Sequence, residues 1–144
     1  MNKAEQVNVT GNHSTMQISH EHIFLFDNTY MSASLLNDTD VELTLIPGSL
    51  ITRKSDDATK VVPATEETLA NVIGIVSTDG NIVLAGAEET EITYALKGTV
   101  NKDLLSFPTG VTLETMVNGK TLQDVLQGIG FQLEGAVEHT KFDN

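Results

Sequence analysis

The residue types best suited to metal binding form the short motif His20-Glu21-His22. On an extended strand the two imidazoles would lie on the same side of the backbone, and imidazole is a common ligand of transition metals. A third ligand could come from His13 or Asp27, but the sequence contains no His-x-x-x-His or Glu-x-x-His helical pattern. Because two ligands do not make a metal site, we expect no metal and interpret these histidines as solvated residues.

The residues that could support catalysis are equally sparse. The chain has no cysteine and no Gly-x-Ser-x-Gly motif, and Gly74, Gly80 and Gly86 do not form a phosphate-binding loop with a following Lys-Ser or Lys-Thr. Paired carboxylates occur at Asp56-Asp57, Glu66-Glu67 and Glu88-Glu89. All three pairs fall in predicted loops, where solvated surface charge is the simpler interpretation. We therefore predict a protein that is not an enzyme, with no catalytic residues and no cofactor.

The overall charge narrows the classes of partner. Eight Lys and Arg residues stand against 20 Asp and Glu residues in a chain of 144, which leaves a net charge of −12. Such a chain is repelled by phosphate backbones and anionic membranes, and it has no Trp on which bases could stack. The longest apolar run, 23–26, is too short to span a bilayer, and we recognise no signal peptide. We therefore expect neither nucleic acid nor a membrane as a partner. We also expect the protein to be made in a cytoplasm.

Composition and alternation predict a mainly β fold, because 40 of the 144 residues are the β-branched Val, Ile or Thr. The predicted strands are 41–45, 50–53, 60–64, 71–77, 82–84, 92–96 and 129–133. A Pro47-Gly48 turn would join the first two of these strands as a pair. The next predicted hairpin consists of strands 71–77 and 82–84, because the segment between them contains an Asp-Gly step.

Short helical segments are predicted at three places. One turn is expected over 68–72, and Asn101 can cap a second over 102–105. The strongest helix spans 122–127, because Thr121 and Asp124 approximate a capping box. We expect Gly128 to end that helix, and its side chains at 122, 125 and 126 to form one apolar face.

The first 20 residues differ from the rest of the chain. They are rich in Asn, Thr, Ser, His and Gln, and their apolar residues form two pairs at period-two spacing: Val7 and Val9, then Met16 and Ile18. Such a segment is typical of an arm that adds as a strand to an exposed sheet edge. We predict an N-terminal arm at 1–20 and a single domain at 21–144.

Four segments, in this order, resemble the lambda-like bacteriophage head decoration proteins: 45–51, 72–76, 98–110 and 122–129. They supply a Pro-Gly turn, an apolar Gly-Ile strand, a Val-Asn-Lys segment before a short helix and a Pro-x-Gly turn, and a Leu-rich helix running into Gly-Ile. The residues that carry this resemblance are Pro47, Gly48, Gly74, Asn101, Pro108, Gly110 and Gly128. The chain departs from the family at the 116–120 hairpin, after Leu133 and in its long N-terminal portion.

The resemblance implies a mainly β (α+β) fold of the β-clip type, a bent ribbon or incomplete barrel with two short helices and an extended arm. It also implies a homotrimer that binds the major capsid protein on the outer surface of the virion and stabilises the expanded head. N-terminal capsid contacts through Val7, Val9, Met16 and Ile18 would follow.

Two alternatives remain open at this point. One is a virion or cell-surface adhesin that recognises a glycan or receptor, which aromatic residues clustered on one exposed face would favour. The other is a small metal-dependent enzyme built on His20 and His22, which stoichiometric zinc retained after dialysis would favour.

Overall fold

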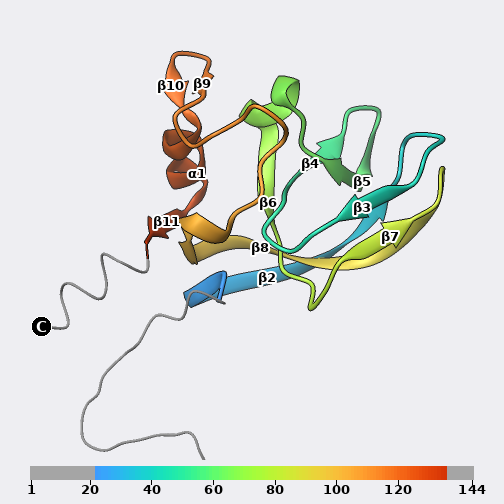
Figure 1. Ribbon diagram of the computed structural model, residues 1–144, viewed down its shortest axis with the longest axis horizontal. Coiled ribbons are helices and arrows are strands. Elements are labelled where there is room, and N and C mark those ends of the chain that lie inside the picture. The colour runs from blue at the N-terminus through green and yellow to red at the C-terminus, as the bar shows by residue number, and fades with distance from the viewer. Residues whose placement is uncertain (1–21, 136–144) are drawn as a thin grey trace, which may run out of the picture.

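The computed structural model describes residues 22–135, and these form a mainly β fold with short helices (Figure 1). The strands are β2 (Phe24–Leu36), β3 (Leu43–Leu45), β4 (Leu50–Lys54), β5 (Asp57–Pro63), β6 (Val72–Val76), β7 (Ile82–Leu84), β8 (Glu89–Asn101), β9 (Met116–Val117), β10 (Lys120–Thr121) and β11 (Phe131–Glu134). The helices are the 3-10 segments η1 (Glu66–Asn71) and η2 (Lys102–Leu104) and the α-helix α1 (Leu122–Ile129).

Five of the strands form an incomplete barrel in the order β8-β2-β5-β4-β6. The last strand of this order, β6, also pairs with the first, β8, over two residues of each strand. Every neighbouring pair in this ring is antiparallel except β2 and β5, which are parallel and meet only at Ser34 and Leu35 of β2. β11 adds to β8 as a parallel sixth strand. The mainly β, incomplete-barrel fold with short helices that the sequence predicts is therefore confirmed.

The apolar core is divided between the two faces of this sheet. Within β4 and β6, adjacent residues face opposite ways: Ile51 and Val76 belong to the barrel interior, whereas Leu50 and Ile75 belong to a second cluster. This alternation follows from the period of two along a strand. All five barrel strands contribute to the inner cluster, which the side chains of β3 and β7 complete at one end.

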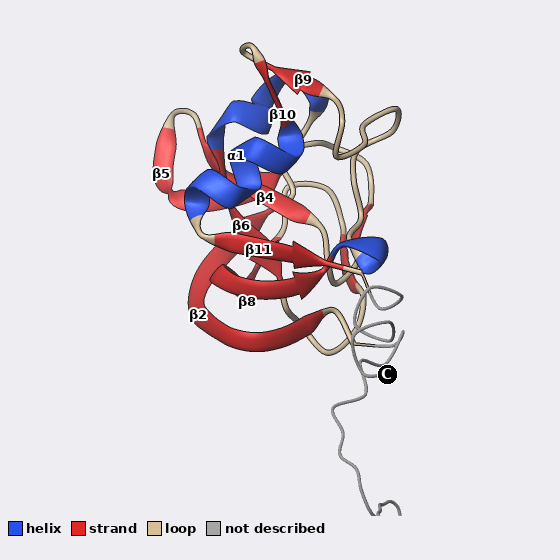
Figure 2. Ribbon diagram, turned by 90° about the vertical axis from the view of Figure 1, so that its left-hand side faces the viewer, coloured by secondary structure: helices blue, strands red, loops and turns tan. Residues whose placement is uncertain are grey.

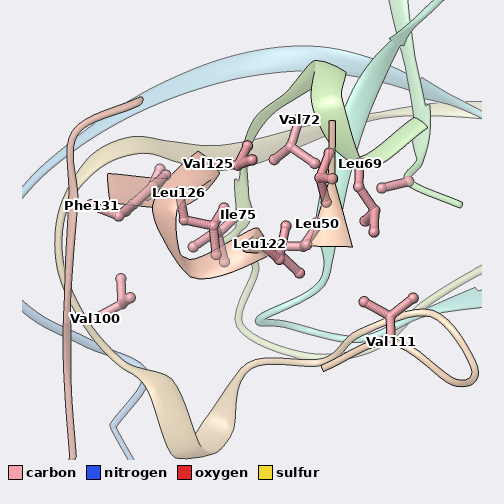
Figure 3. Packing of buried hydrophobic residues seen from close by; sticks show 13 residues of the cluster. Leu50, Leu69, Val72, Ile75, Val100, Val111, Leu122, Val125, Leu126 and Phe131 are labelled. Carbon is pink, nitrogen blue, oxygen red and sulfur yellow. The ribbon is translucent and has the colours of Figure 1, made fainter. Parts of the chain in front are cut away.

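The second cluster lies where α1 covers the outer face of the sheet (Figures 2 and 3). Leu122, Val125 and Leu126 of α1 are buried there, which confirms the predicted apolar face. The helix begins at the predicted capping box, because the Thr121 hydroxyl accepts a hydrogen bond from the backbone N–H of Asp124 at 3.2 Å.

The predicted end of this helix is wrong. Gly128 lies inside α1, and the helix ends at Gly130, whose φ of +129° places it in the region that favours glycine. The backbone N–H of Gly130 donates to the carbonyls of Leu126 and Gln127. Ile129 is consequently the last helical residue, and the final strand begins two residues later than predicted.

The predicted pairings of two strand pairs are also wrong. Strands 41–45 and 50–53 do not pair with each other, and strands 71–77 and 82–84 do not form a hairpin. Instead β3 pairs with β7, and β4 pairs with β5 and β6. The physical reason is burial, because pairing β3 with β7 buries Leu45 and Leu84 together in the inner cluster.

Candidate functional site

Most residues of the predicted arm and the metal motif lie outside the described part of the chain. This holds for Val7, Val9, Met16 and Ile18, and for His13, His20 and Glu21. His22 and Asp27 are described, and both are exposed. Within residues 22–135 there is no group of three or more His, Asp or Glu side chains placed to hold a metal.

The predicted carboxylate pairs lie on the surface. Glu66 and Glu67 lie in η1 and not in a loop, and Glu89 is the first residue of β8. Glu89 accepts hydrogen bonds from Lys60 and from the Ser34 hydroxyl, and the Lys60 hydrogen bond is the main reason that the pKa of Glu89 is lowered. The same contact raises the pKa of Lys60. Both groups are therefore ionised and paired at neutral pH, which suits a structural ion pair.

The resemblance-bearing segments meet in space. Gly48 has a φ of +92°, and the N–H of Ser49 donates to the Ile46 carbonyl at 3.2 Å, so Pro47-Gly48 form the centre of a type II turn. The Gly48 carbonyl accepts a hydrogen bond from the N–H of Ser106 at 3.0 Å. A Cβ on Gly48 would lie 2.8 Å from the Leu104 carbonyl oxygen. The Pro-Gly turn thus packs directly against the segment that follows the Val-Asn-Lys motif.

Gly74 allows a second close contact within the barrel. A Cβ at this position would lie 2.4 Å from Cδ2 of Tyr94 and 2.5 Å from the carbonyl oxygen of Ala95. Both distances are well below an ordinary carbon contact of about 3.5 Å. Glycine is required here because β6 approaches β8 closely.

Asn101 joins β8 to η2 and is only 1% exposed. Its side-chain oxygen accepts a hydrogen bond from the N–H of Asp103 at 3.0 Å, which confirms the predicted cap. Its own N–H donates to the carbonyl of Ile23 at 2.7 Å. Asn101 therefore connects the short helix to the residues that immediately precede β2.

Pro108 and Gly110 form the turn expected after η2. The N–H of Val111 donates to the Pro108 carbonyl at 3.0 Å, and Gly110 has a φ of +81°. Gly128, by contrast, could carry a Cβ with no neighbouring heavy atom within 4 Å outside its own helix. Six of the seven resemblance-bearing residues thus have a turn, capping or close-packing role, and Gly128 has none that the structure explains.

The first long strand, β2, was not predicted from the sequence, and it carries an exposed aromatic and an exposed apolar side chain along an open edge. Between Thr29 and Ala33 it pairs with β8 on one side. No strand within the described chain pairs with its other side there, since β5 joins β2 only at 34–35. Tyr30 and Met31 on this open edge are 47% and 51% exposed.

A hollow of about 590 Å³ lies beside this strand. Its walls come from β2, from β8 and from the loop that follows β6. Phe24 and Tyr30 form one wall, with ring centroids 5.9 Å apart and an interplanar angle of 71°. A second hollow of about 460 Å³ shares Phe24 and residues 77–79 with the first, so the two lie next to each other.

A separate apolar area lies over the outer side of the β3–β7 pair. Val83 is 56% exposed and is directly opposite Thr44 in the register, and Ile46 follows β3 with 39% exposure. This pair lies at the end of the barrel away from α1 (Figure 1).

The sequence matches no protein-family model and no curated protein. Among the described residues, no helix is both long enough and apolar enough to cross a membrane.

Proposed function

We propose that this protein is a structural component of a bacteriophage virion, which binds the outer surface of the expanded capsid as a homotrimer and stabilises the head. The observation that carries the proposal is the contact between the Pro47-Gly48 turn and the 104–106 segment. The 104–106 segment belongs to the most specific part of the resemblance to head decoration proteins, in which Val-Asn-Lys is followed by Leu-Leu and Pro-x-Gly, and the Pro47-Gly48 turn belongs to its first part. Their packing against one another supports a shared scaffold more strongly than separate sequence matches do.

Attachment to the capsid is assigned to the first 20 residues. Only residues 21–23 separate them from β2, and a hydrogen bond from the N–H of Asn101 to the carbonyl of Ile23 ties the chain to the body just before β2. The apolar spacing of Val7 with Val9 and of Met16 with Ile18 suits a strand that adds to a sheet edge of the major capsid protein. Three such arms on one trimer would act together, so the effective affinity would greatly exceed that of one arm.

The physical effect of such a protein is stabilisation by mass action. A ligand that binds the assembled shell and not the free subunits shifts the equilibrium toward the shell. A trimer that bridges neighbouring capsomers opposes their separation under the internal pressure of packaged DNA. The net charge of −12 suits a protein of the particle exterior, because it would repel the genome.

Deleting residues 2–19 tests the attachment step. We expect the deletion to abolish binding to undecorated heads of its phage while the thermal unfolding midpoint changes little, since the described core excludes these residues. A matched variant keeps the full length and replaces Val7, Val9, Met16 and Ile18 with Ser, which preserves chain length and charge but removes the apolar pattern. A deletion variant that saturates heads at the same concentration as the full chain would contradict the assignment.

A further inference from the structure

The two adjacent hollows beside β2, together called the groove below, are lined by residues that the proposed decoration role does not use. Its aromatic wall consists of Phe24 and Tyr30, which pack edge to face. This contact holds the Tyr30 ring in place while 47% of the residue stays exposed. A partly exposed aromatic ring held by a second ring can stack against an apolar ligand surface at little entropic cost.

The rest of the groove is rich in hydroxyl groups. Ser32 and Thr93 are directly paired across β2 and β8, and Ser77 and Thr78 lie in the loop after β6. The loop is held to the sheet because the N–H of Ser77 donates to the Thr93 carbonyl at 3.0 Å. The Ser77 hydroxyl is buried and has no hydrogen-bond partner within the described chain. Buried polar groups normally have partners, so this hydroxyl is a candidate for a ligand contact after a small adjustment.

Two carboxylates, Asp79 and Glu91, complete the lining of the larger hollow. Neither hollow has a Lys or Arg side chain in its walls. Ionised carboxylates accept hydrogen bonds only, so they suit a ligand with many hydroxyl donors. The same charges repel phosphate, sulfate and carboxylate groups, which disfavours anionic ligands, although His22 also lines the smaller hollow.

An aromatic platform, several hydroxyls and two carboxylates in an open groove match the chemistry of a sugar, which has an apolar C–H face and a rim of hydroxyls. The volumes of about 590 and 460 Å³ each fall within the range of small-molecule sites, and two adjacent hollows that share lining residues favour a chain of sugar rings over a single ring. We infer that this groove binds a neutral oligosaccharide, with Tyr30 as the stacking residue and Asp79 and Glu91 as hydroxyl acceptors. The inference is independent of capsid binding.

The test is a calorimetric titration of the full chain with neutral oligosaccharides of glucose, galactose, mannose, xylose and N-acetylglucosamine. Sialylated and sulfated oligosaccharides are titrated in the same way as anionic controls. We expect saturable binding of at least one neutral oligosaccharide, little dependence on salt because the ligand is uncharged, and no binding of the anionic set. Failure of every neutral oligosaccharide to bind would overturn the inference.

Variants locate the site. Tyr30→Ala should weaken binding by about tenfold or more, whereas Tyr30→Phe should keep most of the affinity because the stacking ring remains. Asp79→Asn should also weaken binding. Met31→Ala is the matched control, since Met31 is the next residue of β2, is similarly exposed and does not line the groove.

Head binding by the same variants separates this site from a protein interface. We expect Tyr30→Ala to bind heads as the unmodified chain does. If Tyr30→Ala lost head binding while saccharide affinity stayed unchanged, the groove would be a contact surface for the capsid and the inference would be wrong.

Discussion

Replacing Gly74 with alanine should destabilise the barrel, and the structure sets the scale of the effect. The added Cβ would lie 2.4 Å from the Tyr94 ring and 2.5 Å from the backbone oxygen of Ala95. Restoring an ordinary contact of about 3.5 Å requires β6 and β8 to separate by roughly 1 Å. Overpacking of this kind costs about 1–3 kcal/mol, and the lower entropy of the unfolded alanine chain offsets about 0.4–1 kcal/mol of that.

Gly80→Ala is the matched control for that substitution. No heavy atom lies within 4 Å of a Cβ built at Gly80, and its φ is outside the left-handed region. The substitution then acts only by lowering the conformational entropy of the unfolded chain, so Gly80→Ala should leave the free energy of unfolding unchanged or raise it by about 0.4–1 kcal/mol. Urea unfolding of both variants measures the difference. Equal free energies of unfolding for Gly74→Ala and Gly80→Ala would refute the close approach of β6 to β8.

Three further predictions concern the helix and the surface ion pair. Leu126→Ala should lower the free energy of unfolding by about 2–5 kcal/mol, because Leu126 is fully buried between α1 and the sheet; an unchanged urea midpoint would show that the core lies elsewhere. Thr121→Ala should cost about 1 kcal/mol through loss of the cap, measured against the exposed Gln127→Ala. Because Lys60 lowers the pKa of Glu89, the stability from this pair is present above the ordinary glutamate value of 4.5 and is lost as pH falls below it. Unfolding curves of Glu89→Gln and the unmodified chain should therefore converge below that pH, and a gap that widens in acid would contradict the assignment.

Local signals in the sequence predicted the local structure well. The type II turn at Pro47-Gly48 and the start of α1 at Thr121 each depend on residues within four positions of one another, so their chemistry is visible in a short window. Asn118 and Gly119, with φ of +52° and +89°, likewise form the tight turn that their residue types favour. The helix end was missed because Gly128 and Gly130 both suit a stop signal, and only the positive φ separates them.

Strand pairing could not be predicted in the same way. β3 and β7 pair across a separation of nearly 40 residues, and what selects this pairing is burial of Leu45 and Leu84 at the barrel end. β2 was missed because register shifts between Phe24 and Tyr30, with Asp27 at a φ of +56°, disrupt the alternation that marks a strand. Two signals could have indicated it: the apolar run 23–26, and the alternation of apolar residues with serines over 31–35.

The groove was missed for the same reason. Phe24 and Tyr30 are six residues apart along an irregular strand, and their contact depends on the bulges in β2. The 77–79 loop reaches them because β6 and β8 close the barrel. No window of the sequence brings these three parts together.

The occupancy of undecorated expanded heads at saturation tests the central claim most directly. Heads of the phage assembled without this protein would be mixed with increasing amounts of the full chain, and the bound copies would be counted and located by electron cryo-microscopy. The account predicts saturable binding on the outer surface, with density grouped in threes around three-fold positions and a higher temperature of head disruption. Absence of binding, or binding as isolated single copies that leaves head stability unchanged, would contradict it.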